Sequence, residues 1–393
     1  MKGIIKTLIY DATGIRDEKR SRMLKKKSRL KEIKISGYKS LGTDIQPINL
    51  EMSNLNIIIG ANGAGKSNFI SFFQMLANMM TGALQIYVGK NGSSESLLQF
   101  GSKRTKMISA SLVFQNDRFT DTYEFSLVKA VNDTLIFAEE VINDGKNKFE
   151  LSSGQKESFL LTDEAAHASE RAVRAILSGC KTFQFHDTSS EAHIRSAAYI
   201  ENNRFLMSDG GNVASYLYML KMKYEQYYKR IVDHVRYVMP TFHDFFLEPQ
   251  ILNPQWIKLQ WFEKGNSEYV FGPEHFSDGT LRFIALATLF LQPPELLPQV
   301  IFVDEPELGL HPQAVDVLAS MVQRAKENTQ IIMATQSPRL LDSFDYKDII
   351  VAEKDRETGC TILKRLDEKE IKIWLEDYSL SQIWEKNIIG GQP

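Results

Sequence analysis

Short apolar runs and amphipathic stretches alternate near both ends of this chain. The run LNIIIG at 55–60 is followed by a glycine-rich turn and by the apolar segment NFISFFQMLANMM, which predicts a strand, a loop and a helix in that order. After residue 255, helices are predicted after Ser277 and from Ala314 to Ala325. Strands are predicted around these helices, at 256–262, 299–303, 330–335 and 348–354. Strands that alternate with helices indicate an α/β fold.

The middle of the chain has a different pattern. The segments MISASLVFQ, YEFSLVKAV and TLIFAEEVI read as short strands joined by polar turns, which predicts an antiparallel sheet. Helical periodicity follows from 155 to 237. The predicted organisation is a basic N-terminal extension (1–30), an α/β core (31–105 and 256–393), an antiparallel β segment (106–154) and a mainly helical insertion (155–255).

Composition narrows the function classes only a little. The 47 Lys and Arg residues nearly balance the 49 Asp and Glu residues, so the overall charge gives no argument for nucleic-acid binding. The apolar runs are too short for a membrane span, and no secretion signal is visible at the N-terminus. Cys180 and Cys360 are far apart and lack metal-ligand spacing. We therefore expect a cytoplasmic protein that does not contact a membrane.

One segment has a strong local charge. Between residues 16 and 34 the chain carries ten basic residues against three acidic ones. Such a segment can be an arm that binds DNA or an acidic partner. It can equally be a solvated helical face, or an extension ahead of the folded domain. The basic residues are Arg16, Lys19, Arg20, Arg22, Lys25, Lys26, Lys27, Arg29, Lys31 and Lys34.

The glycine-rich turn carries the clearest chemistry. GANGAGKS at 60–67 fits the pattern G-x-x-x-x-G-K-[ST] between a predicted strand and a predicted helix. In this pattern backbone N–H groups and the helix N-terminus face phosphates, Lys66 reaches the β- and γ-phosphates, and Ser67 binds Mg²⁺. We predict ATP binding by Gly60, Asn62, Gly63, Ala64, Gly65, Lys66, Ser67 and Asn68.

Polar side chains follow two later strands. Asp304 and Glu305 end the predicted strand VIFVDE, at the sheet edge where open α/β folds bind their ligands. Asp304 is predicted to hold Mg²⁺, and Glu305 to orient and deprotonate the attacking water. Gln336 ends the next strand, where it can sense the γ-phosphate or hold that water. The alternatives are an N-cap pair for the two carboxylates and a loop-capping role for Gln336.

The stretch HFSDGTLRF at 275–283 has two interpretations. Ser277 can cap the following helix, and Asp278 and Gly279 favour a turn. The same serine hydroxyl, glycine backbone and helix N-terminus can also form an anion site.

The ordered set GANGAGKS, FSDGTLRF, VIFVDEPELGLHP and ATQSPRLLDSF resembles the ABC-type ATPases of the RecF, SMC and OLD group. It resembles most closely the compact RecF-like ATPases of AAA type. The resemblance runs from about Leu30 to the end of the chain. It implies an ABC-type P-loop ATPase head, with an antiparallel β subdomain and an inserted helical subdomain. It also implies that two heads enclose two ATP molecules, so that Ser277, Asp278 and Gly279 act in trans on the partner's nucleotide.

The sequence also departs from the wider ABC pattern. The signature reads S-D-G-T, which puts the negative charge of Asp278 near the expected phosphate. Gln336 occupies the switch position that usually holds histidine. Gln115 is a candidate for the magnesium-binding glutamine loop, or equally a hairpin residue. No Toprim pattern of a nuclease follows Gln336.

The resemblance leaves two functional interpretations. The first is an ATP-hydrolysing homo-oligomer in DNA repair or antiphage defence, with a separate effector protein and with DNA as a candidate partner. The second is a slow-turnover scaffold or sensor that holds a toxin or nuclease and releases it.

Three further features remain open between structural and functional roles. His186 and Asp187 can form a dyad, or a polar network beside the nucleotide. The aromatic and basic segment 223–239 can stack on bases, or form a packed helical face. Tyr38 and Lys39 lie where this group often places residues near the base or phosphates.

Overall fold

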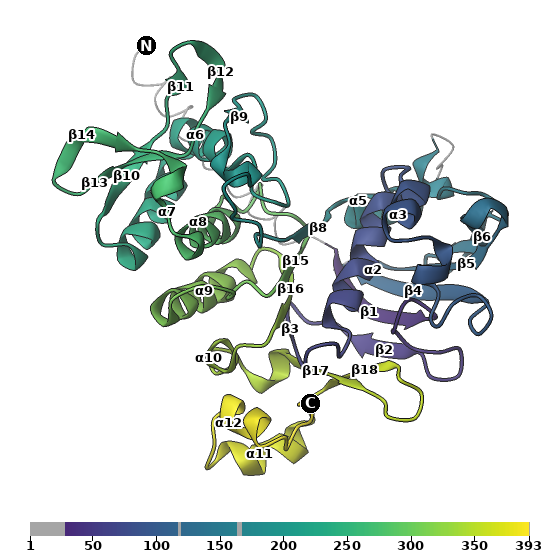
Figure 1. Cartoon of the computed structure of the whole chain (residues 1–393). Helices are drawn as coiled ribbons and strands as arrows, with labels where there is room; N and C mark the ends of the chain where they lie inside the picture. The colour runs from purple at the N-terminus through teal and green to yellow at the C-terminus, as the bar shows by residue number, and fades with distance from the viewer. Residues whose placement is uncertain (1–27, 117–118, 163–166, 393) are drawn as a thin grey trace, which may run out of the picture.

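The computed structural model describes residues 28–116, 119–162 and 167–392. At its centre is a six-stranded sheet of order β18-β17-β3-β16-β15-β8 (Figure 1). Its strands are parallel except for the hairpin of β17 and β18. Their bounds are β3 Leu55–Ile59, β8 Cys180–Phe183, β15 Val300–Asp304, β16 Gln330–Thr335, β17 Ile349–Lys354 and β18 Thr361–Arg365.

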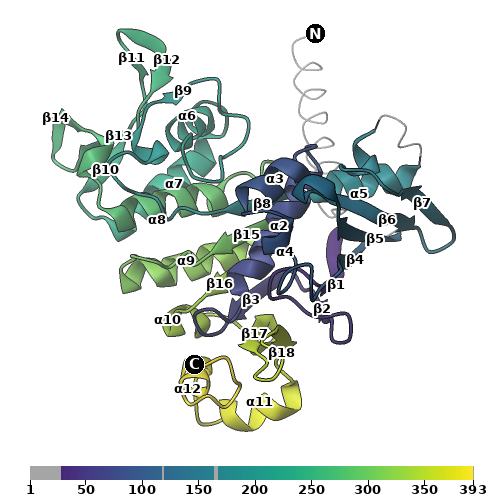
Figure 2. The same cartoon turned by 45° about the vertical axis from the view of Figure 1, so that its right-hand side comes forward.

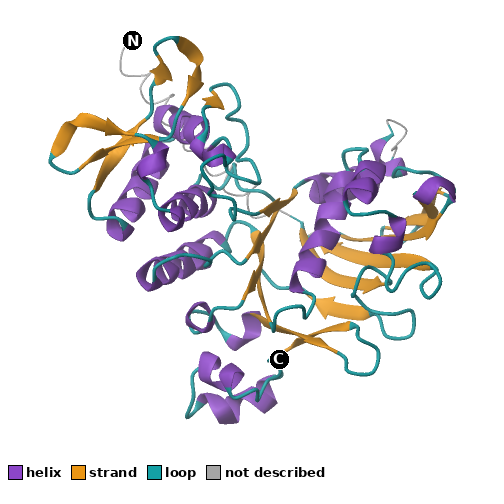
Figure 3. Ribbon diagram, viewed as in Figure 1, coloured by secondary structure: helices purple, strands orange, loops and turns teal. Residues whose placement is uncertain are grey.

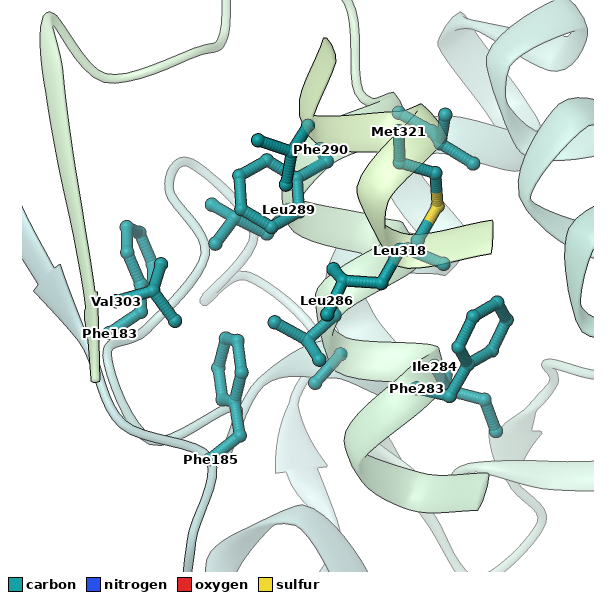
Figure 4. Packing of buried hydrophobic residues seen from close by; sticks show 14 of the residues in the cluster. Phe183, Phe185, Phe283, Ile284, Leu286, Leu289, Phe290, Val303, Leu318 and Met321 are labelled. Atoms are coloured by element: carbon teal, nitrogen blue, oxygen red, sulfur yellow. The ribbon is translucent and has the colours of Figure 1, made fainter. Parts of the chain in front are cut away.

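Both faces of this sheet are covered, which explains why β3, β15 and β16 are buried along their whole length. On β3, Ile57 and Ile59 belong to the apolar cluster formed with α8 (Asp278–Leu291) and α9 (Pro312–Ala325). Ile58 faces the opposite cluster, which contains α2 (Lys66–Met79). Figure 4 shows side chains of β8, β15 and α8 meeting in the first cluster.

A second, antiparallel sheet has the order β2-β1-β4-β5-β6-β7. It packs across α2, α3 (Leu84–Lys90) and α5 (Ala168–Ser178), so these helices lie between the two sheets (Figures 1 and 3). The short helix α4 (Ser94–Leu97) follows α3. The strands are β1 Arg29–Ser36, β2 Ile48–Glu51, β4 Met107–Gln115, β5 Thr120–Lys129, β6 Leu135–Asn143 and β7 Lys148–Ser152.

The predicted antiparallel segment 106–154 therefore needs one addition. Strands β1 and β2 pair with it, although they lie in the part of the chain that the sequence assigned to the α/β core. The strand KEIKIS carries alternating exposed and buried residues, as expected for a sheet with one open face.

A helical part follows on the other side of the central sheet (Figure 2). It contains α6 (Val213–Lys223) and α7 (Glu225–Val238), separated at Tyr224, and α7 packs against α8. Two small three-stranded sheets extend it, of order β10-β13-β14 and β11-β12-β9. Their strands are β9 Ala198–Tyr199, β10 Phe242–Phe246, β11 Pro249–Gln250, β12 Asn253–Ile257, β13 Gln260–Glu263 and β14 Asn266–Phe271.

Strand β8 corrects the prediction for 155–255. The helical periodicity predicted from 155 to 237 runs across this segment, but α5 ends at Ser178 and the chain enters the central sheet at Cys180. Gly179 permits this turn, because a Cβ there would lie 2.8 Å from the Cβ of Gln299. Residues 180–183 thus supply a core strand beside β15.

The chain after β16 forms α10 (Pro338–Leu341), α11 (Glu368–Leu375) and α12 (Leu380–Glu385). Single 3-10 turns lie at Val131–Asp133, Phe159–Leu161, His193–Arg195, Pro273–His275 and Tyr346–Asp348. Of the helices in the described ranges, none has the length and apolar character needed to cross a membrane.

Candidate functional site

The phosphate loop connects β3 to α2 and is shaped by close contacts with β17 and β18. Gly63 and Gly65 have φ values of 78° and 102°, which favour glycine. A Cβ on Gly65 would lie 2.0 Å from the hydroxyl oxygen of Thr361, and one on Gly60 would lie 2.3 Å from the carbonyl oxygen of Ala352. The fold itself therefore requires glycine at these positions.

Other loop residues contribute to the same geometry. The hydroxyl of Thr361 donates to the carbonyl of Ala64 (2.9 Å), and the side-chain amide of Asn68 donates to Ser40 (2.9 Å). Asn62 is exposed at the tip of the turn. Hydrogen bonds from Thr361 and to Ser40 thus fix the loop, while its tip is open to solvent.

Lys66 is folded back onto this loop. Its ammonium group donates to the carbonyl oxygens of Gly60 (2.7 Å) and Ala61 (3.0 Å), and the residue is only 5% exposed. Burial lowers the pKa of Lys66. Three nearby carboxylates act in the opposite direction, those of Glu305, Asp304 and Glu307.

Asp304 ends β15 next to the start of α2. The residue is 7% exposed, and among the described residues its Oδ1 atom has no hydrogen-bond partner. Burial raises the pKa of Asp304, whereas a hydrogen bond with Ser67 lowers it. A carboxylate with an unused oxygen beside a serine hydroxyl fits the ligands that Mg²⁺ prefers. Within the described ranges, no group of three or more His, Cys, Asp or Glu side chains is arranged to hold a metal ion, so further ligands would come from phosphates and water.

Glu305 and Gln336 are in direct contact. The side-chain amide of Gln336 donates to the Glu305 carboxylate, and the backbone N–H of Glu305 donates to Ala334 O (2.9 Å). Glu305 has a φ of 42°, a left-handed conformation that is uncommon outside glycine and often marks functional sites. The ends of β15 and β16 are therefore joined at the two predicted catalytic side chains.

Glu307 supplies a second link between the same two strand ends. Its Oε1 accepts hydrogen bonds from the hydroxyl of Thr335 (2.6 Å) and from the backbone N–H of Gln336 (3.0 Å). Burial raises the pKa of Glu307. The sequence pattern gives this residue no role, although the repeated carboxylate in DEPE is visible.

His186 reaches the site from the segment after β8. Its Nε2–H donates to the carbonyl oxygen of Asp304 (2.9 Å), which supports the interpretation of a polar network near the nucleotide. Arg282 of α8 was not singled out from the sequence. Its guanidinium donates to the carbonyls of His186 (2.8 Å), Phe185 (3.2 Å) and Leu308 (2.8 Å), and so ties α8 to two loops of the site.

Ser277 caps α8, as the sequence predicted. Its hydroxyl oxygen accepts a hydrogen bond from Thr280 N (3.1 Å), and the residue is exposed. Gly279 lies against the loop after β15, where a Cβ would approach the carbonyl oxygen of Gly309 to 2.4 Å. No hydrogen bond or ion pair among the described residues joins 277–279 to the phosphate loop of the same chain.

The charge of Asp278 is balanced inside the protein. Arg195 donates from Nη2 to Asp278 Oδ1 (2.9 Å) and from Nη1 to the carbonyl of Pro273 (2.6 Å). The Arg195 side chain is only 12% exposed. The carboxylate that seemed out of place near a phosphate therefore has a fixed cation beside it.

A cavity of ≈450 Å³ lies beside the phosphate loop. Lys39, Asn68, Phe100 and Lys354 are among the residues that line it. The ammonium group of Lys39 donates to the hydroxyl of Ser71 (3.1 Å). Lys39 and Tyr38 were expected near the nucleotide, and the structure places Lys39 at this cavity.

Two further candidates have structural roles. Gln115 ends β4 opposite Thr120 and Arg29, at the far end of β1 from Ser36, which supports the hairpin interpretation. In the segment 223–239, Tyr228 is buried and Lys221 lies over its ring, which supports a packed helical face. Residues 16–27 of the predicted N-terminal arm lie outside the described residues, and its last basic residues, Arg29, Lys31 and Lys34, lie on β1.

Comparisons with known proteins agree with this geometry. A profile of the family described as "AAA domain, putative AbiEii toxin, Type IV TA system" matches residues 55–342. The fold is similar to an SMC head crystallised with the C-terminal winged-helix domain of ScpA, with TM-score 0.60, 16% identity, and coverage of 86% of this chain and 98% of the other. An SMC head with an extended coiled coil, bound to the ScpA C-terminal domain from Pyrococcus furiosus, gives TM-score 0.58, 15% identity, and coverage of 89% and 99%. This chain belongs to the AAA domain family whose profile it matches, and it has the α/β fold of an SMC-type ATPase head.

Proposed function

We propose that this chain binds ATP at the loop 60–67 and hydrolyses it with Glu305 as the general base. The observation that carries the proposal is the arrangement of three neighbouring strand ends. The phosphate loop follows β3, Asp304 and Glu305 end β15, and Gln336 follows β16. A lysine, two carboxylates and an amide thus surround one place where the backbone can receive phosphates.

The roles follow from the resting contacts. Lys66 satisfies its ammonium group on two loop carbonyls, and the phosphates of ATP are stronger acceptors that would take it over. Ser67 and Asp304 would hold Mg²⁺, which supplies charge neutralisation at the phosphates when bound. Glu305 would accept the proton of the attacking water. Gln336, now bonded to Glu305, would orient that water.

The cavity beside the loop would receive the nucleoside. Phe100 is 55% exposed and offers an apolar ring, while Lys39 and Lys354 offer positive charge. An aromatic ring and cations are suited to a purine base and its attached phosphates.

The active oligomer would be a two-fold dimer that encloses two nucleotides. Ser277 and the N-terminus of α8 are exposed, and within one chain they make no hydrogen bond to the phosphate loop. A second copy would bring them to the phosphates of the first, and symmetry would form both sites at once. Arg195 makes this arrangement electrostatically acceptable by balancing Asp278.

The cellular role would be antiphage defence or DNA repair, with a separate effector protein. The family description names a toxin of a toxin–antitoxin system, and the similar SMC head was crystallised with a partner domain.

DNA would act as a trigger. Phosphate contacts would make such binding fall steeply with salt concentration, and no binding to single- or double-stranded DNA at low salt in the presence of ATP would remove DNA from the proposal.

A slow-turnover scaffold is the second candidate, and one contact favours it. In the single chain, the side-chain amide of Gln336 donates a hydrogen bond to the Glu305 carboxylate. A base that is already bonded to its neighbour has to be released before it can activate water. Turnover would then depend on association or on a partner.

The test is steady-state ATP hydrolysis by the full chain, alone and with DNA. Glu305→Gln should reduce kcat by about 10²–10⁴-fold while ATP binding persists. Lys66→Ala should weaken ATP binding itself. Glu385→Gln, at the exposed last residue of α12, is the matched control and should leave turnover unchanged. Equal turnover in wild type and Glu305→Gln would refute hydrolysis by this site, and negligible wild-type turnover under all conditions would favour the scaffold.

A further inference from the structure

We propose that Glu307 is a positioning residue that sets the place of the Gln336 amide relative to the Glu305 carboxylate. The inference rests on the proposed ATP hydrolysis for its kinetic consequence. The positioning itself depends only on contacts between the loop after β15 and the end of β16.

The contacts converge on a single carboxylate oxygen. Glu307 Oε1 accepts from Thr335 Oγ1 (2.6 Å) and from the backbone N–H of Gln336 (3.0 Å). Thr335 is fully buried, so its hydroxyl has no water as an alternative partner. One acceptor thus fixes both the last residue of β16 and the backbone of the next residue.

Glu307 is itself held in place from both sides of its loop. The N–H of Leu310 donates to the Glu307 carbonyl (3.0 Å), and that of Leu308 donates to the Glu305 carbonyl (3.2 Å). Arg282 of α8 holds the carbonyl of Leu308 (2.8 Å). Because this loop is constrained, the Glu307 carboxylate can hold the end of β16 in one position.

The second oxygen of Glu307 distinguishes this role from simple packing. Oε2 is inaccessible to solvent and has no hydrogen-bond partner among the described residues. Leaving a buried carboxylate oxygen unpaired is costly, so an apolar residue would serve stability better. The arrangement is consistent with selection for the two hydrogen bonds at Oε1, which place the Gln336 side chain on Glu305.

The experiment compares Glu307→Gln, Glu307→Ala and Thr335→Val. Glu307→Gln keeps an acceptor oxygen and should keep kcat within about threefold, because one amide oxygen can accept both bonds. Glu307→Ala removes the acceptor and should lower kcat by about 10–100-fold, since small misplacements of catalytic groups are that costly. The KM for ATP should change less than about threefold, because the phosphate loop is untouched. Thr335→Val removes one donor at equal size and should give a smaller loss of kcat.

A double-mutant cycle separates positioning from general destabilisation. If Glu307 acts through Gln336, then Glu307→Ala added to Gln336→Ala should cause little further loss of kcat. A further loss as large as in the wild-type background would overturn the inference. So would a loss of kcat in Glu307→Gln equal to that in Glu307→Ala.

A readout without turnover makes the inference independent of the proposed activity. Hydrogen exchange of the nucleotide-free protein reports the backbone N–H of Gln336, which donates to Glu307. Glu307→Ala should speed exchange in the peptide that covers 330–340, and Glu307→Gln should restore protection. Unchanged exchange in Glu307→Ala would refute the positioning contact even if the protein hydrolyses ATP. An exchange change in a protein without turnover would support the contact and count against the proposed function alone.

Discussion

Arg195 and Asp278 form an ion pair of 2.9 Å between two segments that lie 83 residues apart in the chain. The arginine comes from the loop region after β8, and the aspartate from the first turn of α8. The pair places a compensating positive charge at the helix N-terminus that is proposed to meet the partner's nucleotide.

Removal of that charge should therefore damage ATP-dependent association. Arg195→Met should weaken association of the full chain by about tenfold or more, equivalent to about 1.4 kcal/mol, because Asp278 would then repel the phosphates. Asp278→Asn added to Arg195→Met should restore most of the association. Sedimentation with ATP in a Glu305→Gln background measures both variants, and a double variant no better than Arg195→Met would contradict the electrostatic explanation.

Ser277→Arg should spare nucleotide binding by a single chain and abolish ATP-dependent dimerisation and turnover. The long cationic side chain would fill the exposed start of α8 where a second phosphate loop has to approach. Titration with a fluorescent ATP analogue and light scattering report the two steps separately. Ser379→Arg is the matched control, because Ser379 also caps a helix, α12. Normal turnover in Ser277→Arg would reduce Ser277 to a helix cap.

Gly279→Ala should be destabilising although alanine favours helices. Its Cβ would approach the Gly309 carbonyl oxygen to 2.4 Å, and overpacking of this kind costs about 1–3 kcal/mol. Gly89→Ala in α3 is the control, because nothing lies within 4 Å of a Cβ there. That change should be neutral or stabilising by up to about 1 kcal/mol. Chemical denaturation measures both, and equal stabilities would contradict the close approach of α8 to the 305–310 loop.

Stability of the nucleotide-free protein should depend on pH through Glu307. Burial raises the pKa of the Glu307 carboxyl in the folded state, so the folded protein holds this proton at a pH where the unfolded chain has lost it. Stability from this group therefore falls as pH rises through the folded-state pKa. The contribution of Glu307 to stability does not change with pH well below the ordinary glutamate pKa of about 4.3.

Glu307→Gln should accordingly raise the unfolding free energy at pH 8, by about 1–3 kcal/mol, because it removes the desolvation cost of a buried negative charge. The difference from wild type should shrink as the pH is lowered towards about 4. Thermal unfolding in EDTA without nucleotide measures it, with Glu385→Gln as the control. A difference that grows at low pH would contradict the assigned direction.

Much of this site follows from local sequence, because its strongest features are contiguous. GANGAGKS carries its own strand, turn and helix start, and Ser277 caps the helix that its position predicts. The pair Asp304 and Glu305 lies at a strand end, where parallel sheets bring side chains together. In each case the signal lies within about fifteen residues, which is the range over which periodicity is informative.

The missed features depend on contacts between distant segments. Strand β8 is only four residues long, follows directly on α5, and is identified by its pairing with Val300–Val303. Arg195 becomes important only when the fold brings it to Asp278. Glu307 looked like an ordinary turn residue because its partners, Thr335 and Gln336, come 28 and 29 residues later. Short strands and long-range polar pairs leave no periodic signal.

The place of β3 in the central sheet also determines when the site can exist during synthesis. This strand pairs with β16 on one side and β17 on the other, so the strand before the phosphate loop has no sheet neighbours until residues 330–354 have been made. Gly60 and Gly65 then pack against Ala352 and Thr361. A growing chain on the ribosome cannot complete the proposed ATP site before residues up to Thr361 have emerged. Contacts of such long range favour slow folding, so the nascent chain would stay unable to capture nucleotide until its core has closed.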